Sequence, residues 1–130
     1  MAYIEVQQAT RQFKNGEQVT VANRDISFEV DQGAVVVILG PSGAGKSTLL
    51  NILGGMDSPT SGRVLVDGVD IAQFNSRQLT TYRRQAVGFV FQFYNLVPNL
   101  TARENVELAS QITKDARDVD GTLALVGLTH

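Results

Sequence analysis

The chain has 130 residues, with 11 lysines and arginines against 13 aspartates and glutamates and a formal net charge of -2 at pH 7. Hydrophobic residues make up 43% and charged residues 18%, which is typical of a globular domain with a core and excludes a disordered or collagen-like chain. The lack of cysteine excludes a disulfide scaffold, a thiolate metal site and a cysteine nucleophile, and the slight acidity argues against nucleic acid as a partner bound through bulk charge.

The first third of the chain is predicted to be rich in β-structure. Polar and apolar residues alternate over 3–6 and 26–30, and an Asn-Gly turn signal at 15–16 favours antiparallel pairing. A turn at 31–33 leads into residues 34–39, an apolar, β-branched run typical of a central strand covered on both faces. A short apolar helix is expected over 47–54, ending at Gly54 and Gly55.

The rest of the chain alternates strands and helices in the predicted pattern. A turn-rich segment at 57–62 precedes a strand at 64–66, which ends in an Asp-Gly turn and resumes at Val69. We expect helices over 76–84, from Thr101 towards Ile112 and over 118–126, and a buried strand over 87–91. Because no repeat or linker divides the sequence, residues 1–130 are expected to form part of a single α/β domain.

One motif carries the chemistry. Residues 40–48 fit the P-loop pattern of a glycine, four residues and then Gly-Lys-Ser/Thr, between a predicted buried strand and a predicted helix. This context allows backbone N–H groups and a helix N-terminus to converge on a polyphosphate, whereas a plain surface turn needs no lysine and serine there. The expected nucleotide-binding residues are Gly40, Pro41, Ser42, Gly43, Ala44, Gly45, Lys46, Ser47 and Thr48.

The residue types of this loop predict distinct roles. Lys46 is expected to reach the β and γ phosphates, Ser47 to place its hydroxyl on Mg²⁺, and Thr48 to add an α-phosphate contact. The sequence contains no two adjacent acidic residues, so it offers no obvious carboxylate pair to hold metal and polarise water. Asp67 follows a strand, but Gly68 after it makes a structural turn the better interpretation.

Several segments together resemble a known family. The P-loop, the Pro-Thr-Ser-Gly turn at 59–62, the Val-Asp-Gly at 66–68, and above all residues 87–106 resemble the ATP-binding subunit of ABC transporters. The Phe-Gln-Phe-Tyr-Asn-Leu-Val-Pro sequence at 91–98 looks most like the branch that exports macrolides and antimicrobial peptides or releases lipoproteins. The resemblance implies a P-loop NTPase core of the ABC type, with an N-terminal antiparallel β layer, that binds ATP and Mg²⁺.

The resemblance also assigns roles outside the P-loop. Gln92 would be the Q-loop glutamine that reaches Mg²⁺ and the attacking water, and with Lys46 it would serve catalysis. Phe13 lies where the family stacks an aromatic on adenine, and Val21 would pack near the base or ribose. Residues 93–100, from Phe93 to Leu100, would receive a coupling helix of the transmembrane subunit. On the residues alone, Phe13 could instead cap the β layer and Gln92 could satisfy backbone groups.

Two further residue groups are interpreted as having no functional role. The arginines at 77, 83 and 84 are more typical of a solvated helix face than of a nucleic-acid site. The only histidine, His130, has no partners for metal ligation.

The resemblance implies motifs that these 130 residues lack. Family members continue with a Leu-Ser-Gly-Gly-type signature, an acidic strand end with a catalytic glutamate, and a switch histidine, so the chain is expected to be an N-terminal part. We expect it to bind ATP without turning it over, because hydrolysis in the family needs two subunits arranged head to tail. The expected location is the cytoplasm, peripheral to the membrane through the transporter subunit.

Two other functions fit the sequence. One is a soluble ATPase of the ABC type that acts without a transporter, and the other is a short nucleotide-binding module that does not hydrolyse. No secretory signal or membrane-spanning run is expected, because the N-terminus lacks a basic and an apolar region and the densest apolar run, at 34–39, has six residues.

Overall fold

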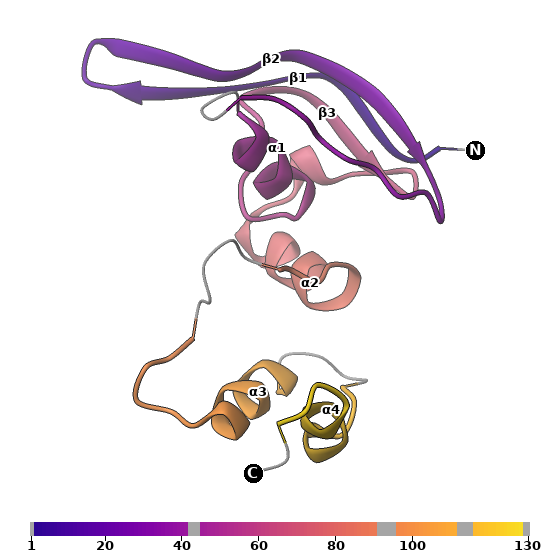
Figure 1. Cartoon of the computed structure of the whole chain (residues 1–130). Helices are drawn as coiled ribbons and strands as arrows, with labels where there is room; N and C mark the ends of the chain where they lie inside the picture. The colour runs from indigo at the N-terminus through magenta and orange to yellow at the C-terminus, as the bar shows by residue number, and fades with distance from the viewer. Residues whose placement is uncertain (1, 42–44, 91–95, 112–115, 129–130) are drawn as a thin grey trace. The chain divides into compact units, whose positions relative to one another are not determined.

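The structure is a computed structural model that describes residues 2–41, 45–90, 96–111 and 116–128. It divides into two compact units, residues 1–83 and 84–130. The first contains a sheet and the second contains two helices (Figure 1).

The sheet of the first unit has four strands in the order β2-β1-β3-β4, each antiparallel to its neighbour. Strands β1 (Ala2–Asn15) and β2 (Gln18–Asp31) form a long hairpin, and β3 (Ser61–Val66) pairs with the other edge of β1. The hairpin turns at Gly16, whose φ of 65° suits glycine. The predicted antiparallel pairing of the first two strands is confirmed.

A tight turn joins β3 to the short strand β4 (Val69–Asp70). Both central residues, Asp67 and Gly68, have positive φ values of 50° and 81°, as the hairpin turn expected of an Asp-Gly pair requires. The interpretation of Asp67 as a turn residue is therefore confirmed.

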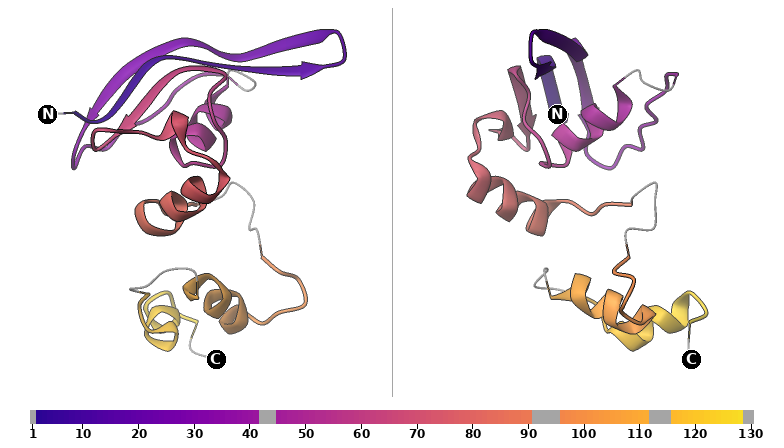
Figure 2. Two further views of the ribbon diagram at one scale, coloured as in Figure 1. Left: turned by 180° about the vertical axis from the view of Figure 1, so that it is seen from behind. Right: turned by 90° about the vertical axis from the view of Figure 1, so that its left-hand side faces the viewer.

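The helix after the P-loop, α1 (Lys46–Leu53), packs against the sheet (Figures 1 and 2). Its Ile52 side chain is 1% exposed and enters the core. The helix ends as predicted, with Gly54 as its C-cap and Gly55 at a φ of 79°. The core cluster combines residues of the sheet, α1 and the 3-10 turn η1 (Ile71–Gln73): Val6, Ala9, Ile52, Val64, Val66 and Ile71.

Helix α2 (Ser76–Ala86) anchors the C-terminal end of α1. The Tyr82 hydroxyl donates a 2.7 Å hydrogen bond to the Leu53 carbonyl, and burial, followed by the electrostatic influence of Tyr3, raises the pKa of Tyr82. The guanidinium of Arg83 donates a 2.7 Å hydrogen bond to the Gly55 carbonyl. A cation at the end of α1 also complements the helix dipole.

The three arginines of α2 differ in their exposure and contacts. Arg77 and Arg84 are exposed, in agreement with the prediction of a solvated face. Arg83 is half-buried and bonds to the loop after α1, so the solvated-face interpretation is wrong for this residue. The sequence does not reveal the difference, because the partner of Arg83 is a backbone carbonyl 28 residues away.

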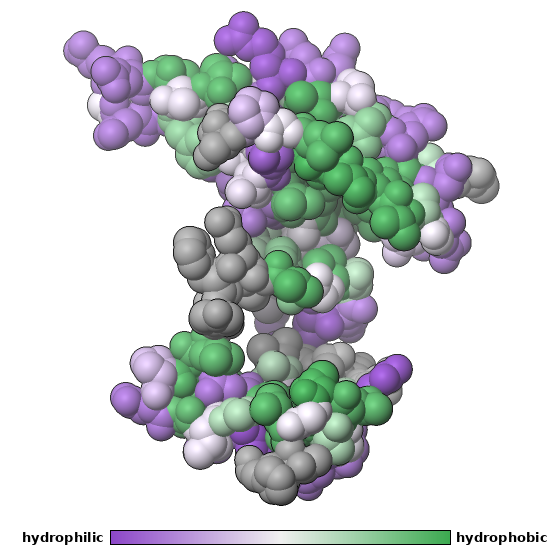
Figure 3. Space-filling view, in the orientation of Figure 1, coloured by the Kyte–Doolittle hydropathy of each residue, from purple (hydrophilic) through white to green (hydrophobic). Residues whose placement is uncertain are grey.

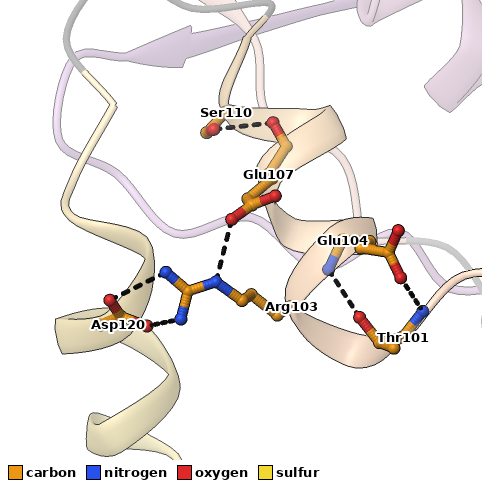
Figure 4. Close-up of polar contacts among 6 residues, drawn as sticks. All are labelled: Thr101, Arg103, Glu104, Glu107, Ser110 and Asp120. Atoms are coloured by element: carbon orange, nitrogen blue, oxygen red, sulfur yellow. Dashed lines mark hydrogen bonds and ion pairs between the residues drawn. The ribbon is translucent and has the colours of Figure 1, made fainter.

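The second unit contains α3 (Ala102–Ser110) and α4 (Val119–Leu125). The predicted capping box is present at the start of α3: Thr101 Oγ1 accepts a 3.1 Å hydrogen bond from the Glu104 N–H, and Glu104 Oε1 accepts one of 3.0 Å from the Thr101 N–H (Figure 4). These bonds, the backbone one foremost, lower the pKa of Glu104. Helix α4 begins after Asp118, which accepts a 2.8 Å hydrogen bond from the Gly121 N–H.

Arg103 connects the two helices of this unit. Its Nε donates a 3.0 Å hydrogen bond to Glu107 one turn along α3, and its two terminal nitrogens bond to the two carboxylate oxygens of Asp120 on α4 (Figure 4). The hydrogen bond to Asp120, followed by the one to Glu107, raises the pKa of Arg103. This planar fork is the geometry that arginine uses to bind a carboxylate.

Two predicted strands are absent. Residues 34–40 and 87–90 have no regular secondary structure, so the predictions of strands at 34–39 and 87–91 are wrong over the described positions. Instead of being buried, Val35 is 94% exposed and Leu39 85%. A buried strand needs hydrogen-bonded neighbours on both sides, and residues 34–40 pair with none of the four strands of the sheet in the first unit. Apolar residues form part of the visible surface of the first unit (Figure 3).

Candidate functional site

The P-loop leads directly into the N-terminus of helix α1. Gly45 is the N-cap of α1, with a left-handed φ of 87°, and no side chain caps the helix there. The first N–H groups of a helix have no partner within the helix, so an uncapped N-terminus leaves them available to an anion. Ser42, Gly43 and Ala44 lie outside the described residues.

Lys46 brings a cation to the same loop. Its ammonium group donates a hydrogen bond to the carbonyl of Gly40, so the lysine side chain reaches back to the first residue of the loop. Lys46 is half-buried, whereas Gly40 and Pro41 are exposed. The ammonium group is thus held across the loop, at the end of α1 where the helix dipole is positive and an anion is favoured.

The side chains expected to follow the lysine lie in the first turn of α1. Ser47 is exposed and Thr48 is half-buried. Among the residues that the structure describes, no group of three or more histidine, aspartate or glutamate side chains could hold a metal ion. An exposed serine hydroxyl fits the coordination of Mg²⁺ in a phosphate complex, where the substrate and water supply most ligands.

Strand β2 supports the P-loop at its last glycine. A Cβ atom built at Gly45 would lie 2.1 Å from the carbonyl oxygen of Ala22, so only glycine fits this close approach. Asn23, which is 6% exposed, donates a 3.1 Å hydrogen bond from Nδ2 to the Gly45 carbonyl. Sequence reasoning missed Asn23, because a lone asparagine in a strand pattern gives no sign of its contact.

The residues expected to hold the base lie on the same hairpin. In the ladder, Phe13 on β1 pairs with Thr20 on β2, and Val21 pairs with Gln12. Thr20 is three residues from Asn23, a span of about 10 Å along a strand. An extended nucleoside triphosphate can bridge such a distance. Strand β2 therefore contacts the end of the P-loop at Gly45 and pairs with Phe13 a few residues away. Val21 is half-buried and pairs with Gln12.

The expected docking segment is described in part. Gln92, Phe93 and Tyr94 lie outside the described residues. After them, Leu96 is 63% exposed and Val97 is 41% exposed. Asn105 holds this stretch: its Oδ1 accepts a 2.8 Å hydrogen bond from the Val97 N–H, and its Nδ2 donates a 2.9 Å bond to the Thr101 carbonyl.

A hollow of about 540 Å³ lies elsewhere, at the other end of β1 from Phe13. Its lining includes Tyr3, Leu65 and three carboxylates, those of Glu5, Glu29 and Asp67. Because these carboxylates would repel phosphate, the hollow does not suit a nucleotide.

Comparison with known proteins decides the family. The sequence matches the ABC transporter family over residues 23–130. The chain belongs to the ABC transporter family. An ABC transporter ATP-binding protein of Mycoplasma pneumoniae is 44% identical over 130 residues, which cover 98% of this chain and 28% of that protein. One of Thermotoga maritima is 55% identical over 93 residues, or 72% of this chain and 40% of that protein.

Export proteins are also among the relatives of this ABC chain. The macrolide export ATP-binding/permease protein MacB of Brucella abortus is 47% identical over 105 residues, or 81% of this chain and 16% of that protein. The solved dimer of the ATP-binding cassette MJ0796 of Methanocaldococcus jannaschii, in a post-hydrolysis state with ADP and Pi, matches at a TM-score of 0.81 with 40% identity. That match covers 88% of this chain and 50% of the cassette.

The structural match confirms the predicted fold class, an ABC-type P-loop fold with an antiparallel β layer. The chain spans half or less of the length of the relatives named above. In the part of the chain that the structure describes, no helix is both long and apolar enough to cross a bilayer.

Proposed function

We propose that this ABC chain binds MgATP through its P-loop and contributes the ATP-binding part of an export transporter. The observation that carries the proposal is the N-terminus of α1, where an uncapped helix begins at a left-handed glycine and the Lys46 ammonium group bonds to the Gly40 carbonyl. This arrangement suits a polyphosphate, because free N–H groups, the positive end of the helix dipole and a lysine belong to the same short segment.

In the proposed complex, Lys46 moves from the Gly40 carbonyl to the β and γ phosphates, and Thr48 contacts the α phosphate. Ser47 and Gln92 would hold Mg²⁺, which neutralises phosphate charge during phosphoryl transfer. Phe13 would stack on adenine, with Val21 near the base or ribose. The remaining loop residues, Gly40 to Gly45, would present their backbone to the phosphates.

We propose that the complete protein hydrolyses ATP and that these 130 residues alone bind it without turnover. Phosphoryl transfer to water requires groups that orient the water and stabilise the developing charge. Of the roles that the family resemblance implies, Lys46 and Gln92 are the catalytic ones in this sequence, and it has no adjacent acidic residues. We therefore infer that residues 1–130 are part of one ATP-binding domain whose hydrolysis needs a second copy, arranged head to tail.

The second proposed partner is a transmembrane subunit, which would place the protein at the cytoplasmic face of the membrane. Leu96 and Val97, exposed on a stretch held by Asn105, supply apolar surface for a docking helix within residues 93–100. The resemblance to a macrolide export protein supports export as the direction of transport.

Calorimetric titration of the chain with MgATP tests the proposal, with Lys46→Ala as the variant. Loss of a charge-assisted contact to phosphate costs about 1.5–3 kcal/mol, so the affinity should fall by roughly 10- to 150-fold. Lys14→Ala is the matched control, because it removes the same charge from an exposed position on β1. Equal affinities of Lys46→Ala and the wild type would refute the assignment of the site.

A further inference from the structure

Phe13 lies where the fold itself gives its ring little support. The last pair between β1 and β3 is Thr10 with Ser61, so Phe13 is on the two-stranded part of the hairpin that extends beyond β3 (Figure 1). The residue is 41% exposed. A ring on such a ribbon has no core to fix it, and a platform for a planar base must be held in one orientation.

Arg11 supplies support to one face of the ring. Its guanidinium carbon lies 4.5 Å from the centroid of the Phe13 ring, within the range of a cation–π contact. The two residues are two apart on β1, and their contact shows that the two side chains lie on the same side of the strand. With the cation on one face of the ring, a base would stack on the other.

Arg11 is held in turn by the loop that leaves α1. Its Nε lies 2.9 Å from Asp57 Oδ2 in an ion pair whose geometry is not that of a linear hydrogen bond, and the two side chains are only 26% and 29% exposed. The other carboxylate oxygen of Asp57 accepts a 2.8 Å hydrogen bond from the Ser58 N–H. The Asp57 N–H donates a 3.3 Å bond to the Asn51 carbonyl in α1.

The same loop is also bonded to β1 on both sides of Arg11. The Thr60 N–H donates a 2.7 Å hydrogen bond to the Thr10 carbonyl, and the Gln12 N–H donates a 3.0 Å bond to Thr60 Oγ1. Residues 57–60 therefore fix this part of β1 relative to the P-loop helix.

From these contacts we propose that Arg11 is a positioning residue for nucleotide binding. Asp57 holds Arg11, and Arg11 orients the Phe13 ring so that its other face can stack on the base. The chain of contacts from α1 through Asp57 and Arg11 to Phe13 sets the platform relative to the helix whose N-terminus binds the phosphates. The inference rests on the proposed function and adds a determinant that acts on the base and not on the phosphates.

Two ligands separate the contribution of the base to binding from that of the phosphates. Calorimetry with MgATP and with magnesium tripolyphosphate, which has the phosphates but no base, is carried out on the full chain. Arg11→Ala should weaken MgATP binding by roughly two- to fivefold, the effect of an exposed cation–π contact, and leave tripolyphosphate binding unchanged. Asp57→Asn should act in the same direction. Arg63→Ala, an exposed arginine of β3, is the matched control and should change neither affinity.

A double-mutant cycle then identifies Phe13 as the group through which Arg11 acts. In a Phe13→Ala background, Arg11→Ala should have no further effect on MgATP affinity, because the ring it positions is gone. Arg11→Lys, which keeps the charge without the planar fork, should retain part of the affinity. Circular dichroism spectra that match the wild type establish that the variants are folded.

Each alternative result has a distinct meaning. Equal losses of MgATP and tripolyphosphate binding in Arg11→Ala would overturn the inference, since they would indicate a general effect on the fold or the P-loop. Unchanged MgATP affinity, or additive effects of Arg11→Ala and Phe13→Ala, would overturn it as well. If the wild type binds neither ligand, the proposed function itself fails, and the inference fails with it.

Discussion

Replacement of Gly45 by alanine tests the contact between the P-loop and β2. Gly45 has a φ of 87°, and an added Cβ would lie 2.1 Å from the Ala22 carbonyl oxygen and 2.7 Å from Asn23 Nδ2. Gly33 offers a matched control, because its φ of 84° is almost the same but nothing lies within 4 Å of its added Cβ. Gly33→Ala therefore carries the backbone strain alone, whereas Gly45→Ala adds a collision.

The two substitutions should differ clearly in stability. A left-handed conformation costs an L-residue about 1–2 kcal/mol, which is the effect expected for Gly33→Ala. Forcing an extra carbon into a packed site costs about 1–3 kcal/mol more, so Gly45→Ala should lower the free energy of unfolding by about 2–5 kcal/mol. That loss is a large part of the stability of a small domain, which is about 5–15 kcal/mol.

Urea unfolding followed by circular dichroism measures the difference, and calorimetry with MgATP measures its effect on binding. We expect Gly33→Ala to bind MgATP like the wild type and Gly45→Ala to bind it poorly, because the collision displaces the N-terminus of α1. If Gly45→Ala is no less stable than Gly33→Ala, the close approach of the P-loop to β2 is refuted.

Two further predictions concern Tyr82 and Asn105. Tyr82→Phe removes the hydrogen bond to Leu53 from a half-exposed site, so it should lower stability near pH 7 by roughly 0.5–1 kcal/mol. Because folding raises the pKa of Tyr82, the neutral side chain stabilises the fold below the ordinary tyrosine pKa, and this stabilisation is lost as the pH rises through the folded pKa. The difference in melting temperature between the wild type and Tyr82→Phe should therefore narrow above about pH 10. A difference that stays constant with pH would contradict the argument. Asn105→Ala removes the acceptor of the Val97 N–H, and hydrogen exchange at that amide should accelerate about fivefold. The Glu104 amide, bonded to Thr101, is the internal control, and equal acceleration there would show that α3 itself has loosened.

Local signals in the sequence predicted much of this fold. The Asn-Gly and Asp-Gly turns, the capping box at Thr101 and Glu104, and the glycines after α1 are confirmed, because each depends on contacts within a few residues. Alternation of polar and apolar residues indicated strands at 3–6 and 26–30, which lie in β1 and β2. The roles of Phe13, Val21, Gln92 and the P-loop residues stay predictions that the binding experiments address.

The sequence by itself determined the P-loop, its place before a helix and the family, since all three follow from the order of residues along the chain. The tertiary structure decided which residues support the loop: Asn23 against Gly45, and Asp57 through Arg11 against Phe13. It also decided that residues 34–37, 39 and 40 are exposed, although the composition of this segment favours a buried strand. The physical reason is the same in both cases, because burial and long-range contacts depend on neighbours that are distant in the chain, and no local pattern records where those neighbours lie.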